Sequence, residues 1–389
     1  MRLLIVGSGM YVTGRDGTGT GTILSSLAQF SKSSVIEVVV VSKSKESAAA
    51  VAEATRRINA LLKSVLKVSF SSLGVQPEQM IEALHKEKKF SACIIAVPDH
   101  LHFTFGKICL NLSIPTLMVK PLTPFVDEAI ELIHIAKKNN TFACVEFHKR
   151  YDETNLWIKK AIRENKIGKL NYFVVDYSQR INIPMNVFKR WSNQSNIFQY
   201  LGVHYVDLIY FLTGFQPVRV TAYGTNGILK KSGLDTYDSV HAMIEWKNPN
   251  DSEDRFVSTL NTNWIDPNCS SALSDQKYKV VGTGGRIECD QKNRGIELVT
   301  ETTGIQQINP YFSEYLPDEN GDLCFQGYGY TSIQLFLKDV MDVSGKKSTV
   351  QQLNALRPSF QEAFISVAVV EAVNKSMKNN SAWTDVRTR

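Results

Sequence analysis

A single lysine stands at the end of a short apolar run and directly before a proline. The segment from 117 to 123 reads LMVKPLT, and its lysine is Lys120. The apolar run is typical of a buried parallel strand, and Thr123 as N-cap before Pro124 predicts that a helix begins there. An ammonium at the carboxyl end of such a strand is partly desolvated, so it could hold a substrate hydroxyl and modulate proton transfer. The alternative is a surface lysine that happens to precede a helix.

A second group of reactive side chains has the spacing of one helix face. Tyr200, His204 and Asp207 are four and then three residues apart, which puts them on the same side of a helix. Histidine titrates near neutrality and can accept the proton of a hydroxyl group as hydride leaves. Gly202 within this helix costs ~1 kcal/mol relative to alanine, which indicates a close approach there. The alternative is a structural histidine with a satisfied hydrogen bond.

The first apolar run leads directly into a glycine-rich turn. Glycine here would let the backbone approach a pyrophosphate near a helix N-terminus. Val12 takes the place of a third glycine, and the next helix is expected only after 17–21. We therefore interpret 11–20 as an inserted, flexible loop over the phosphates, with Gly21 in the helix-packing role; the alternative is a plain glycine-rich connection. The residues expected to hold the dinucleotide here are Gly7, Ser8, Gly9 and Met10.

The end of the second strand carries the residues that select between the two dinucleotides. An acidic residue there would bind the ribose 2′-hydroxyl of NAD, but the chain has Ser42 and Lys43. A hydroxyl and an ammonium suit a 2′-phosphate, so NADP is the preferred cofactor and NAD the alternative. Further contacts with the nicotinamide side are expected from the turn after the fourth strand and from the lysine, namely Pro98, Asp99, His102 and Lys120.

The elements that must position these residues alternate between strands and helices over the first part of the chain. Nearly continuous Val, Ile, Ala and Leu runs are typical of strands covered on both faces, and strand–helix alternation predicts a doubly wound parallel sheet. The expected strands are 3–7, 36–42, 65–70, 92–97, 116–120 and 142–147, with helical periodicity over 46–62, 79–86 and 127–138.

The periodicity changes after about Arg150. Alternating apolar and polar residues predict a mixed, mainly antiparallel sheet with one wetter face. The expected strands are 170–179, 218–224, 239–246, 256–264, 277–281, 286–289 and 296–300, and the expected helices are 153–165, 197–213 and 359–378.

These patterns define an α/β chain with two domains, as its length also suggests. Residues 1–123 are expected to form a Rossmann domain that binds NAD(P). Residues 124–354 are expected to form an α+β domain, with an open sheet for substrate binding and dimerisation. The terminal helix, about 355–379, is expected to pack back on the first domain.

Composition excludes several classes of protein. The 389 residues are 43% hydrophobic and 21% charged, as in a soluble globular protein. The chain has a net charge of +6, but its basic residues are scattered and interleaved with acidic ones. They form no basic stripe, so no nucleic-acid partner is expected. The opening apolar run is too short for a signal peptide, and no run is long enough to cross a membrane. The dispersed cysteines, Cys93, Cys109 and Cys144 among them, indicate a reduced cytoplasmic protein with no metal site.

Several motifs in this order resemble one family. They are VPDxxH at 97–102, VKPL at 119–122, FHKRY at 147–151, IGK at 167–169 and GVHYVD at 202–207. Together they resemble the Gfo/Idh/MocA oxidoreductases, named after glucose–fructose oxidoreductase and inositol dehydrogenase. The resemblance implies a Rossmann domain followed by an open mixed sheet, with assembly into a homodimer or homotetramer. It also implies NAD(P)-dependent oxidation or reduction of sugars, cyclitols and sugar nucleotides.

The resemblance also assigns roles to two residues. Lys120 matches the active-site lysine of the family, and His204 matches the histidine that usually serves as acid and base. Two positions depart from the family pattern. Val119 replaces the acid that commonly precedes the lysine, which should lower the pKa of Lys120. Tyr200 replaces an aspartate, so His204 and Tyr200 both remain candidates for the proton carrier.

Substrate contacts are expected from the loops around these groups. Arginines and aromatic rings suit a polyhydroxylated or acidic ligand, although each could equally form a surface ion pair. The candidates are Arg150, Tyr151, Arg180, Asn182, Asp207 and Trp264. The leading hypothesis is an NADP-preferring enzyme that moves hydride between nicotinamide and a secondary alcohol or ketone of a sugar or cyclitol. The alternatives are a non-catalytic sugar or dinucleotide sensor, and a glycosidase that uses NAD transiently.

Overall fold

The computed structural model of the chain describes residues 1–14 and 21–388. Most of the predicted loop over 11–20 therefore lies outside the described residues. The chain forms two compact units. The first contains Met1–Thr123, Asp127–Tyr151 and Tyr311–Ala363, and the second contains Pro124–Val126, Asp152–Pro310 and Phe364–Arg389. These units differ from the expected domains, because two later stretches of the chain complete the first unit and most of the terminal helix groups with the second.

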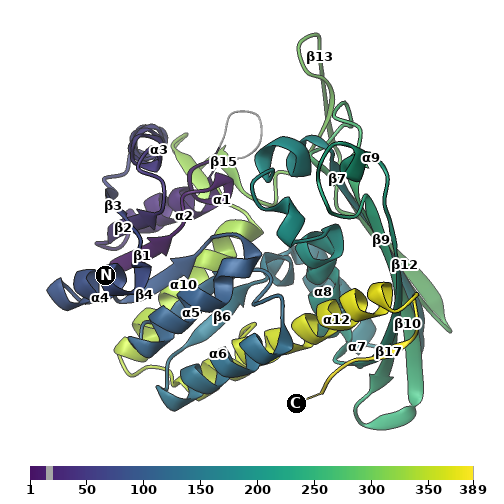
Figure 1. Cartoon of the computed structure of the whole chain (residues 1–389). Coiled ribbons are helices and arrows are strands. Elements are labelled where there is room, and N and C mark those ends of the chain that lie inside the picture. The colour runs from purple at the N-terminus through teal and green to yellow at the C-terminus, as the bar shows by residue number, and fades with distance from the viewer. Residues whose placement is uncertain (15–20, 389) are drawn as a thin grey trace. The chain divides into compact units, whose positions relative to one another are not determined.

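The first unit is built on a six-stranded parallel sheet (Figure 1). Its strand order is β3-β2-β1-β4-β5-β6, so the chain starts in the middle and extends the sheet first on one side and then on the other. This order is that of the doubly wound dinucleotide-binding fold, which confirms the predicted class. The strands are β1 Arg2–Val6, β2 Glu37–Ser42, β3 Lys67–Ser72, β4 Ala92–Ile95, β5 Thr116–Val119 and β6 Ala143–Glu146.

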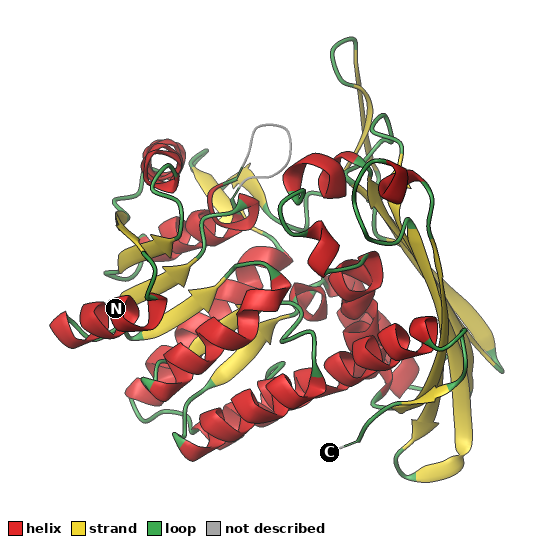
Figure 2. Cartoon of the chain, viewed as in Figure 1, coloured by secondary structure: helices red, strands yellow, loops and turns green. Residues whose placement is uncertain are grey.

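Helices cover both faces of this sheet, as Figure 2 shows. Alternate strand residues such as Leu3 and Ile5 join one buried cluster with Ile333 and Phe336 of α10. On the other face, Cys109 of α5 lies 3.5 Å from Cys93 of β4, measured between the two sulfurs. The helices are α1 Met10–Thr13, α2 Thr22–Ser31, α3 Ser47–Leu62, α4 Pro77–Glu87, α5 His102–Asn111, α6 Val126–Lys138, α10 Tyr328–Ser344 and α11 Val350–Leu356.

The outer edge of β6 is covered by a distant segment of the chain. The amide of Val145 donates to the carbonyl of Pro358 at 2.8 Å, and Cys144 forms a bridge with Ser359. This pairing satisfies backbone groups that an edge strand would otherwise expose. A hairpin, β15 Glu314–Pro317 with β16 Leu323–Gln326, also belongs to the first unit.

The second unit is built on a seven-stranded mixed sheet with the order β12-β11-β7-β10-β9-β8-β17. Neighbouring strands are antiparallel except for the parallel pair β7 and β10, which confirms the predicted, mainly antiparallel sheet. β11 begins at Ser274, three residues before the expected start of that strand at 277. The strands are β7 Leu170–Arg180, β8 Gln216–Thr225, β9 Ser239–Asn248, β10 Asp251–Asp266, β11 Ser274–Gly282, β12 Gly285–Asp290 and β17 Thr384–Asp385, with a separate hairpin of β13 Ile296–Thr300 and β14 Gly304–Ile308.

The two faces of this sheet differ in composition. One face is buried and packs aromatic rings, such as Tyr177 and Tyr278 against Tyr205 of α8. The other face carries a row of polar residues in register across the strands, in which Asn261 bonds to both Asp176 at 3.0 Å and His241 at 2.9 Å. The helices of this unit are α7 Glu153–Arg163, α8 Val203–Thr213, α9 Ile228–Lys231 and α12 Phe360–Lys378, whose first residues belong to the first unit.

A buried polar network fixes the start of α7 within the second unit. Asp152 is the N-cap, accepts from the amide of Thr154 at 3.1 Å and forms an ion pair with Arg294. Gln291 donates to Asn155 at 3.0 Å and accepts from the hydroxyl of Tyr205 at 2.8 Å. The network therefore joins α7 to α8, the helix that carries His204.

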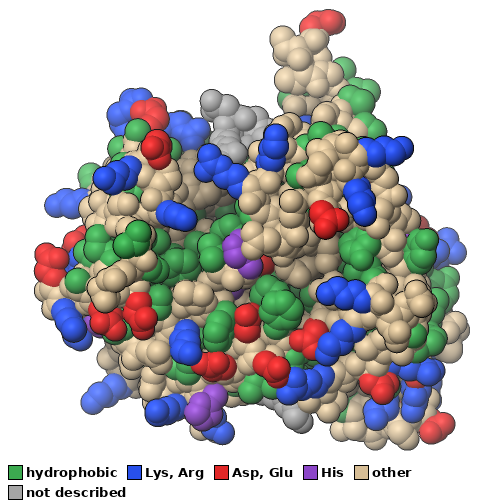
Figure 3. Space-filling model, in the orientation of Figure 1, with side chains coloured by type: hydrophobic (Ala, Val, Ile, Leu, Met, Phe, Trp, Pro, Cys, Tyr) green, Lys and Arg blue, Asp and Glu red, His purple; other side chains and the backbone are tan. Residues whose placement is uncertain are grey.

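The charge pattern on the surface agrees with the even distribution in the sequence. Figure 3 shows lysines and arginines interspersed with aspartates and glutamates over the visible face. In the described part of the chain, no helix is both long and apolar enough to cross a bilayer.

Candidate functional site

Four strands of the first unit end with polar or glycine residues at the same edge of the sheet. Parallel strands present their carboxyl ends together, and ligands of this fold bind beyond that edge where the strand order reverses, here between β1 and β4. Gly7 follows β1, Asp99 follows β4, Lys120 follows β5 and Glu146 ends β6. These four positions define the candidate site of the first unit.

The glycine turn after β1 requires glycine at one position and leaves open space at another. Gly7 has a φ of 107°, and a Cβ there would lie 2.1 Å from the carbonyl oxygen of Ala96. A Cβ on Gly9 would meet nothing within 4 Å. Gly9 is also the N-cap of α1, a single helical turn that begins at once rather than after the predicted loop. The space above Gly9 fits the approach of a pyrophosphate to the backbone.

The backbone at Gly21 is packed closely, in agreement with its predicted packing role. Its backbone is left-handed, with a φ of 74°, and a Cβ would lie 2.6 Å from the carbonyl carbon of Thr13. The start of α2 therefore approaches the end of α1 closely, and a side chain at this position would not fit.

Three serine hydroxyls gather at the carboxyl end of β2. The hydroxyl oxygen of Ser8 lies within hydrogen-bond distance of two others, at 3.0 Å from that of Ser42 and at 2.8 Å from that of Ser47. Lys43 beside them is exposed. Ser47 was not among the predicted site residues, because it lies five positions beyond the strand end and only the fold brings it to Ser8. Hydroxyls next to an exposed ammonium form a polar surface that suits the 2′-phosphate of NADP.

His102 has no exposed surface and joins the turns after β4 and β5. Its Nδ1 lies 2.6 Å from the carbonyl oxygen of Pro121 and its Nε2 lies 2.9 Å from that of Val97. Burial lowers the pKa of His102. His102 was predicted to contact the cofactor, but both ring nitrogens face backbone carbonyls. In this geometry it holds Pro98 and Asp99 on one side and Lys120 on the other.

Lys120 is half-buried at the end of β5, and its bond to Pro121 is cis. Burial disfavours the charged form and lowers the pKa of Lys120 to about 8, while the carboxylates of Asp99 and Glu146 oppose that shift. The direction agrees with the expectation from Val119, although burial is the main cause. A lysine with this pKa can exist in either protonation state near neutrality, so it can donate a hydrogen bond or exchange a proton.

The second unit presents Tyr200 and His204 at the start of α8. Tyr200 lies within a π-helical turn, Phe198–Gly202, and His204 follows that turn as the second residue of α8. Such turns are frequent at functional sites. A Cβ on Gly202 would lie 2.7 Å from the ring of Phe198, which accounts for the predicted close approach. The ring of His204 is buried and lies 6.4 Å from that of Tyr177. Tyr200 is half-buried, with its ring 4.9 Å from that of Phe188.

Three of the predicted substrate residues have structural partners and little exposed surface. Trp264 is fully buried, and its indole nitrogen donates to Gln179 at 3.0 Å. Arg150 is buried and forms an ion pair with Glu362 at 2.9 Å. Asp207 is 3% exposed. Trp264 and Arg150 therefore have partners within the fold. Contact of these three residues with a substrate stays a prediction.

The other three predicted substrate residues are half-buried. Arg180 donates to the hydroxyl of Ser270 at 3.3 Å, and the amide of Asn182 donates to Asn268 at 3.0 Å. Tyr151 ends the second stretch of the first unit, and burial raises its pKa well above the usual range. These residues keep some accessible surface, so they remain candidates for substrate contact.

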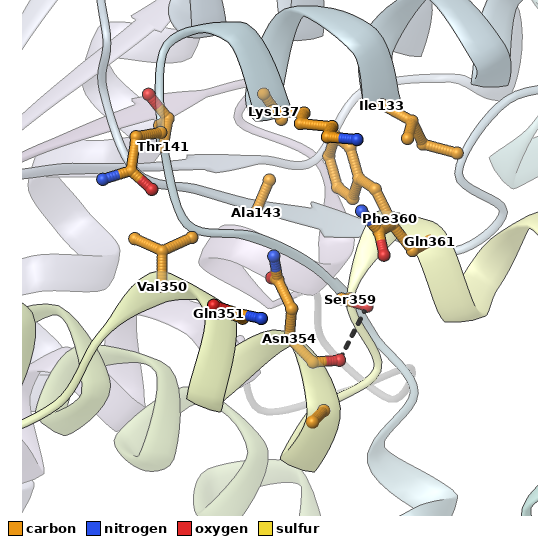
Figure 4. A pocket seen from close by; sticks show the side chains of 13 residues that line it. Ile133, Lys137, Thr141, Ala143, Val350, Gln351, Asn354, Ser359, Phe360 and Gln361 are labelled. Carbon is orange, nitrogen blue, oxygen red and sulfur yellow. Dashed lines mark hydrogen bonds between the residues drawn. The ribbon is translucent and has the colours of Figure 1, made fainter.

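A cavity of about 510 Å³ lies elsewhere in the first unit. Figure 4 shows the side chains of Lys137, Gln351 and Asn354 around it, with the hydroxyl of Ser359 donating to the carbonyl of Asn354 at 3.2 Å. Thr141 and Ala143 place it at the amino end of β6. The cavity is therefore at the opposite end of that strand from Glu146 and is not the candidate site.

The comparisons with known proteins agree with both units. Residues 1–147 match the family described as oxidoreductases with an NAD-binding Rossmann fold, and residues 156–288 match the Gfo/Idh/MocA C-terminal domain. The chain belongs to the Gfo/Idh/MocA oxidoreductase family. The predicted family is thereby confirmed, and with it an NAD(P)-binding Rossmann domain.

Two of the relatives with a named activity are inositol dehydrogenases. The chain is 24% identical over 167 residues to scyllo-inositol 2-dehydrogenase (NADP(+)) IolW of Bacillus subtilis, covering 43% of this chain and 46% of that protein. It is 24% identical over 222 residues to inositol 2-dehydrogenase of Rhizobium meliloti, covering 57% and 63%. The matches thus span about half the length of these relatives, or somewhat more.

Solved structures share the fold over the full length. Myo-inositol 2-dehydrogenase of Lactobacillus plantarum superposes with a TM-score of 0.69 at 16% identity, covering 100% of this chain and 99% of that one. Scyllo-inositol dehydrogenase of Lactobacillus casei, solved with NAD(H) and scyllo-inositol, gives 0.67 at 14% identity with the same coverage. At these identities the likeness establishes the fold alone.

One residue at the carboxyl edge, Glu146, was missed in the sequence. Glu146 is 2% exposed and accepts from Nδ1 of His148 at 2.9 Å. The signal was available, because Glu146 ends a predicted strand next to the one that ends at Lys120. Glu146 comes close to the Lys120 segment because β5 pairs with β6. The sequence alone does not show which strands pair.

Proposed function

We propose that the protein is an NADP-preferring dehydrogenase or reductase that acts on a secondary alcohol or ketone of a sugar, cyclitol or sugar derivative. The observation that carries this proposal is Lys120, a half-buried lysine at the carboxyl edge of a 3-2-1-4-5-6 sheet with a pKa of about 8. A lysine in this position can donate to the oxygen of the reacting alcohol or carbonyl group.

The residues of the first unit fit a dinucleotide. Gly9 leaves room for a pyrophosphate, and the serine hydroxyls with Lys43 offer donors for a 2′-phosphate. Asp99 and Lys120 border the crevice where the nicotinamide end would lie. When bound, the nicotinamide supplies the carbon that gives or accepts hydride.

The proton is assigned to the second unit. His204 matches the family's acid–base histidine, and imidazole suits a proton that must be taken and returned near neutrality. Tyr200 is the alternative carrier, because its half-buried hydroxyl group replaces the family's aspartate at that position. Lys120, in the first unit, is assigned the orientation and polarisation of a substrate oxygen.

The protein is proposed to form a homodimer or homotetramer through the exposed face of the second sheet. That face carries exposed apolar side chains, Tyr223, Met243 and Val257, beside its polar row. Burial of such a patch against a second copy would remove apolar surface from water.

Cofactor binding is the first test of this function. The purified protein is titrated with NADPH and with NADH while nicotinamide fluorescence is recorded. Saturation that is tighter for NADPH is expected, and sugars and cyclitols are then screened for hydride transfer by absorbance. The variant Lys120→Met should still bind NADPH, through the phosphate contacts at the other end of the dinucleotide, and show no turnover. Absence of binding for both dinucleotides would contradict the proposal and favour the non-catalytic sensor.

A further inference from the structure

Glu146 is a buried carboxylate that the proposed reaction has not used. It ends β6, is 2% exposed and accepts a hydrogen bond from His148 through Oε2 alone. Within the described part of the chain, Oε1 has no hydrogen-bond partner. A buried carboxylate oxygen without a donor is costly, so a nearby positive charge is needed to compensate it.

The strand register shows where that charge lies. Val119 of β5 pairs with Glu146 of β6, and residues paired in parallel strands point to the same face about 5 Å apart. A carboxylate at position 119 would occupy the space next to Glu146, directly before Lys120 in the chain. The chain has valine there, so Glu146 is the carboxylate that the sheet brings to this place.

We propose that Glu146 is the positioning carboxylate of Lys120, supplying from β6 the negative charge that an acid at position 119 would supply from β5. The inference rests on the proposed function, because it explains how the lysine of that function is kept in a usable state. The influence of Glu146 on Lys120 is electrostatic: its charge favours the ammonium form that burial disfavours.

The other charged groups around Lys120 set the limits of this effect. Asp99, from the turn after β4, also favours the ammonium form. Burial lowers the pKa of His102 of α5, and the charge of Lys120 adds to that effect. His148 fixes the Glu146 carboxylate and is itself held by the rings of Phe312 and Tyr328, at 4.9 and 5.7 Å.

Groups farther along the same elements have other partners. Cys144, two residues before Glu146, is buried, and its pKa is raised by burial and by the charges of Asp339 and Glu146. Arg150 is held by Glu362, and Arg357 by Asp339. Asp99 and Glu146 are both carboxylates whose charge favours the ammonium form of Lys120.

The test measures the titration of Lys120 in the full-length protein without turnover. Acetic anhydride is used as a trace label at a series of pH values, and mass spectrometry of the Lys120 peptide gives the midpoint of its reactivity. The wild-type midpoint is expected near pH 8. Glu146→Gln should shift it downward, since a stabilising charge is lost. Glu131→Gln, at an exposed position of α6, is the matched control and should leave the midpoint unchanged.

Rescue distinguishes positioning from a structural role. Val119→Glu in the Glu146→Gln background should move the midpoint back up, and Val119→Glu alone should raise it above the wild type. The second variant keeps the test decisive even if Glu146→Gln fails to fold. An unchanged midpoint in Glu146→Gln, or no response to Val119→Glu, would overturn the proposal. Failure to find any oxidisable sugar would count against the proposed function only, because labelling requires no catalysis.

Discussion

At the scale of single residues, Lys43 distinguishes the two dinucleotides. Its ammonium is exposed beside the hydroxyls of Ser8, Ser42 and Ser47, where the ribose 2′-phosphate of NADP would lie. The 2′-hydroxyl of NAD would give this ammonium no charged partner. We expect Lys43→Ala to weaken NADPH binding about tenfold, since a charge-assisted hydrogen bond contributes roughly 1.5–3 kcal/mol. NADH binding should change less than about twofold.

Fluorescence titration of both dinucleotides measures this difference. Lys86→Ala, an exposed lysine on α4, is the control and should change neither affinity. An equal loss for NADPH and NADH would show that Lys43 does not read the 2′-phosphate.

Single residues were predicted correctly from the sequence where the neighbouring residues in the chain mark their position in the fold. Lys120 was placed correctly at a strand end, because an apolar run and a following proline mark that position locally. Trp264 and Arg150 were expected at the substrate, yet their partners Gln179 and Glu362 are distant in the chain. A side chain's type shows that it can bind a ligand, but only the fold shows whether a buried neighbour already takes that role.

At the scale of elements, the two glycines of the β1–α1 turn have different roles, Gly7 in folding and Gly9 in ligand binding. Gly7→Ala places a Cβ against the carbonyl of Ala96 at a positive φ, so we expect the free energy of unfolding to fall by about 2 kcal/mol or more. Gly9→Ala meets no atom within 4 Å, so its stability should match the wild type while NADPH affinity falls about tenfold or more.

Urea unfolding and NADPH titration of both variants measure the two effects separately. The two glycines serve as each other's control, because they differ by only two positions. If Gly9→Ala bound NADPH like the wild type, the pyrophosphate would not lie over this turn.

Element prediction succeeded where one period continued long enough to be counted. Buried β1, β2 and β5 are nearly unbroken apolar runs, and their parallel sheet followed from the helices between them. The helix expected over 197–213 is instead divided by the π-helical turn at Phe198–Gly202. Such a turn shifts the hydrogen-bond pattern without changing the apolar spacing, so periodicity does not reveal it.

At the scale of the whole molecule, the exposed sheet face predicts the state of assembly. Met243 is 40% exposed on β9, within the proposed contact between copies. In an interface with twofold symmetry Met243→Glu would place two unpaired charges against the same patch, so the oligomer should dissociate. Light scattering coupled to size exclusion would then give the monomer mass for the variant and a multiple of it for the wild type.

Leu356→Glu is the matched control, since Leu356 is 71% exposed on α11 of the first unit. It should leave the mass unchanged. A wild-type protein that already runs as a monomer would contradict the proposed assembly.

The composition of the first unit has a consequence for biosynthesis. Its sheet is finished only when Arg357–Ser359 covers the edge of β6, and its residues extend to Ala363. The second unit in turn includes Phe364–Arg389. Each unit therefore lacks some of its residues until most of the chain has been synthesised. For this reason the two units cannot be completed one after the other during translation. Until then the nascent chain carries an uncovered strand edge, and shielding by chaperones would matter most during that interval.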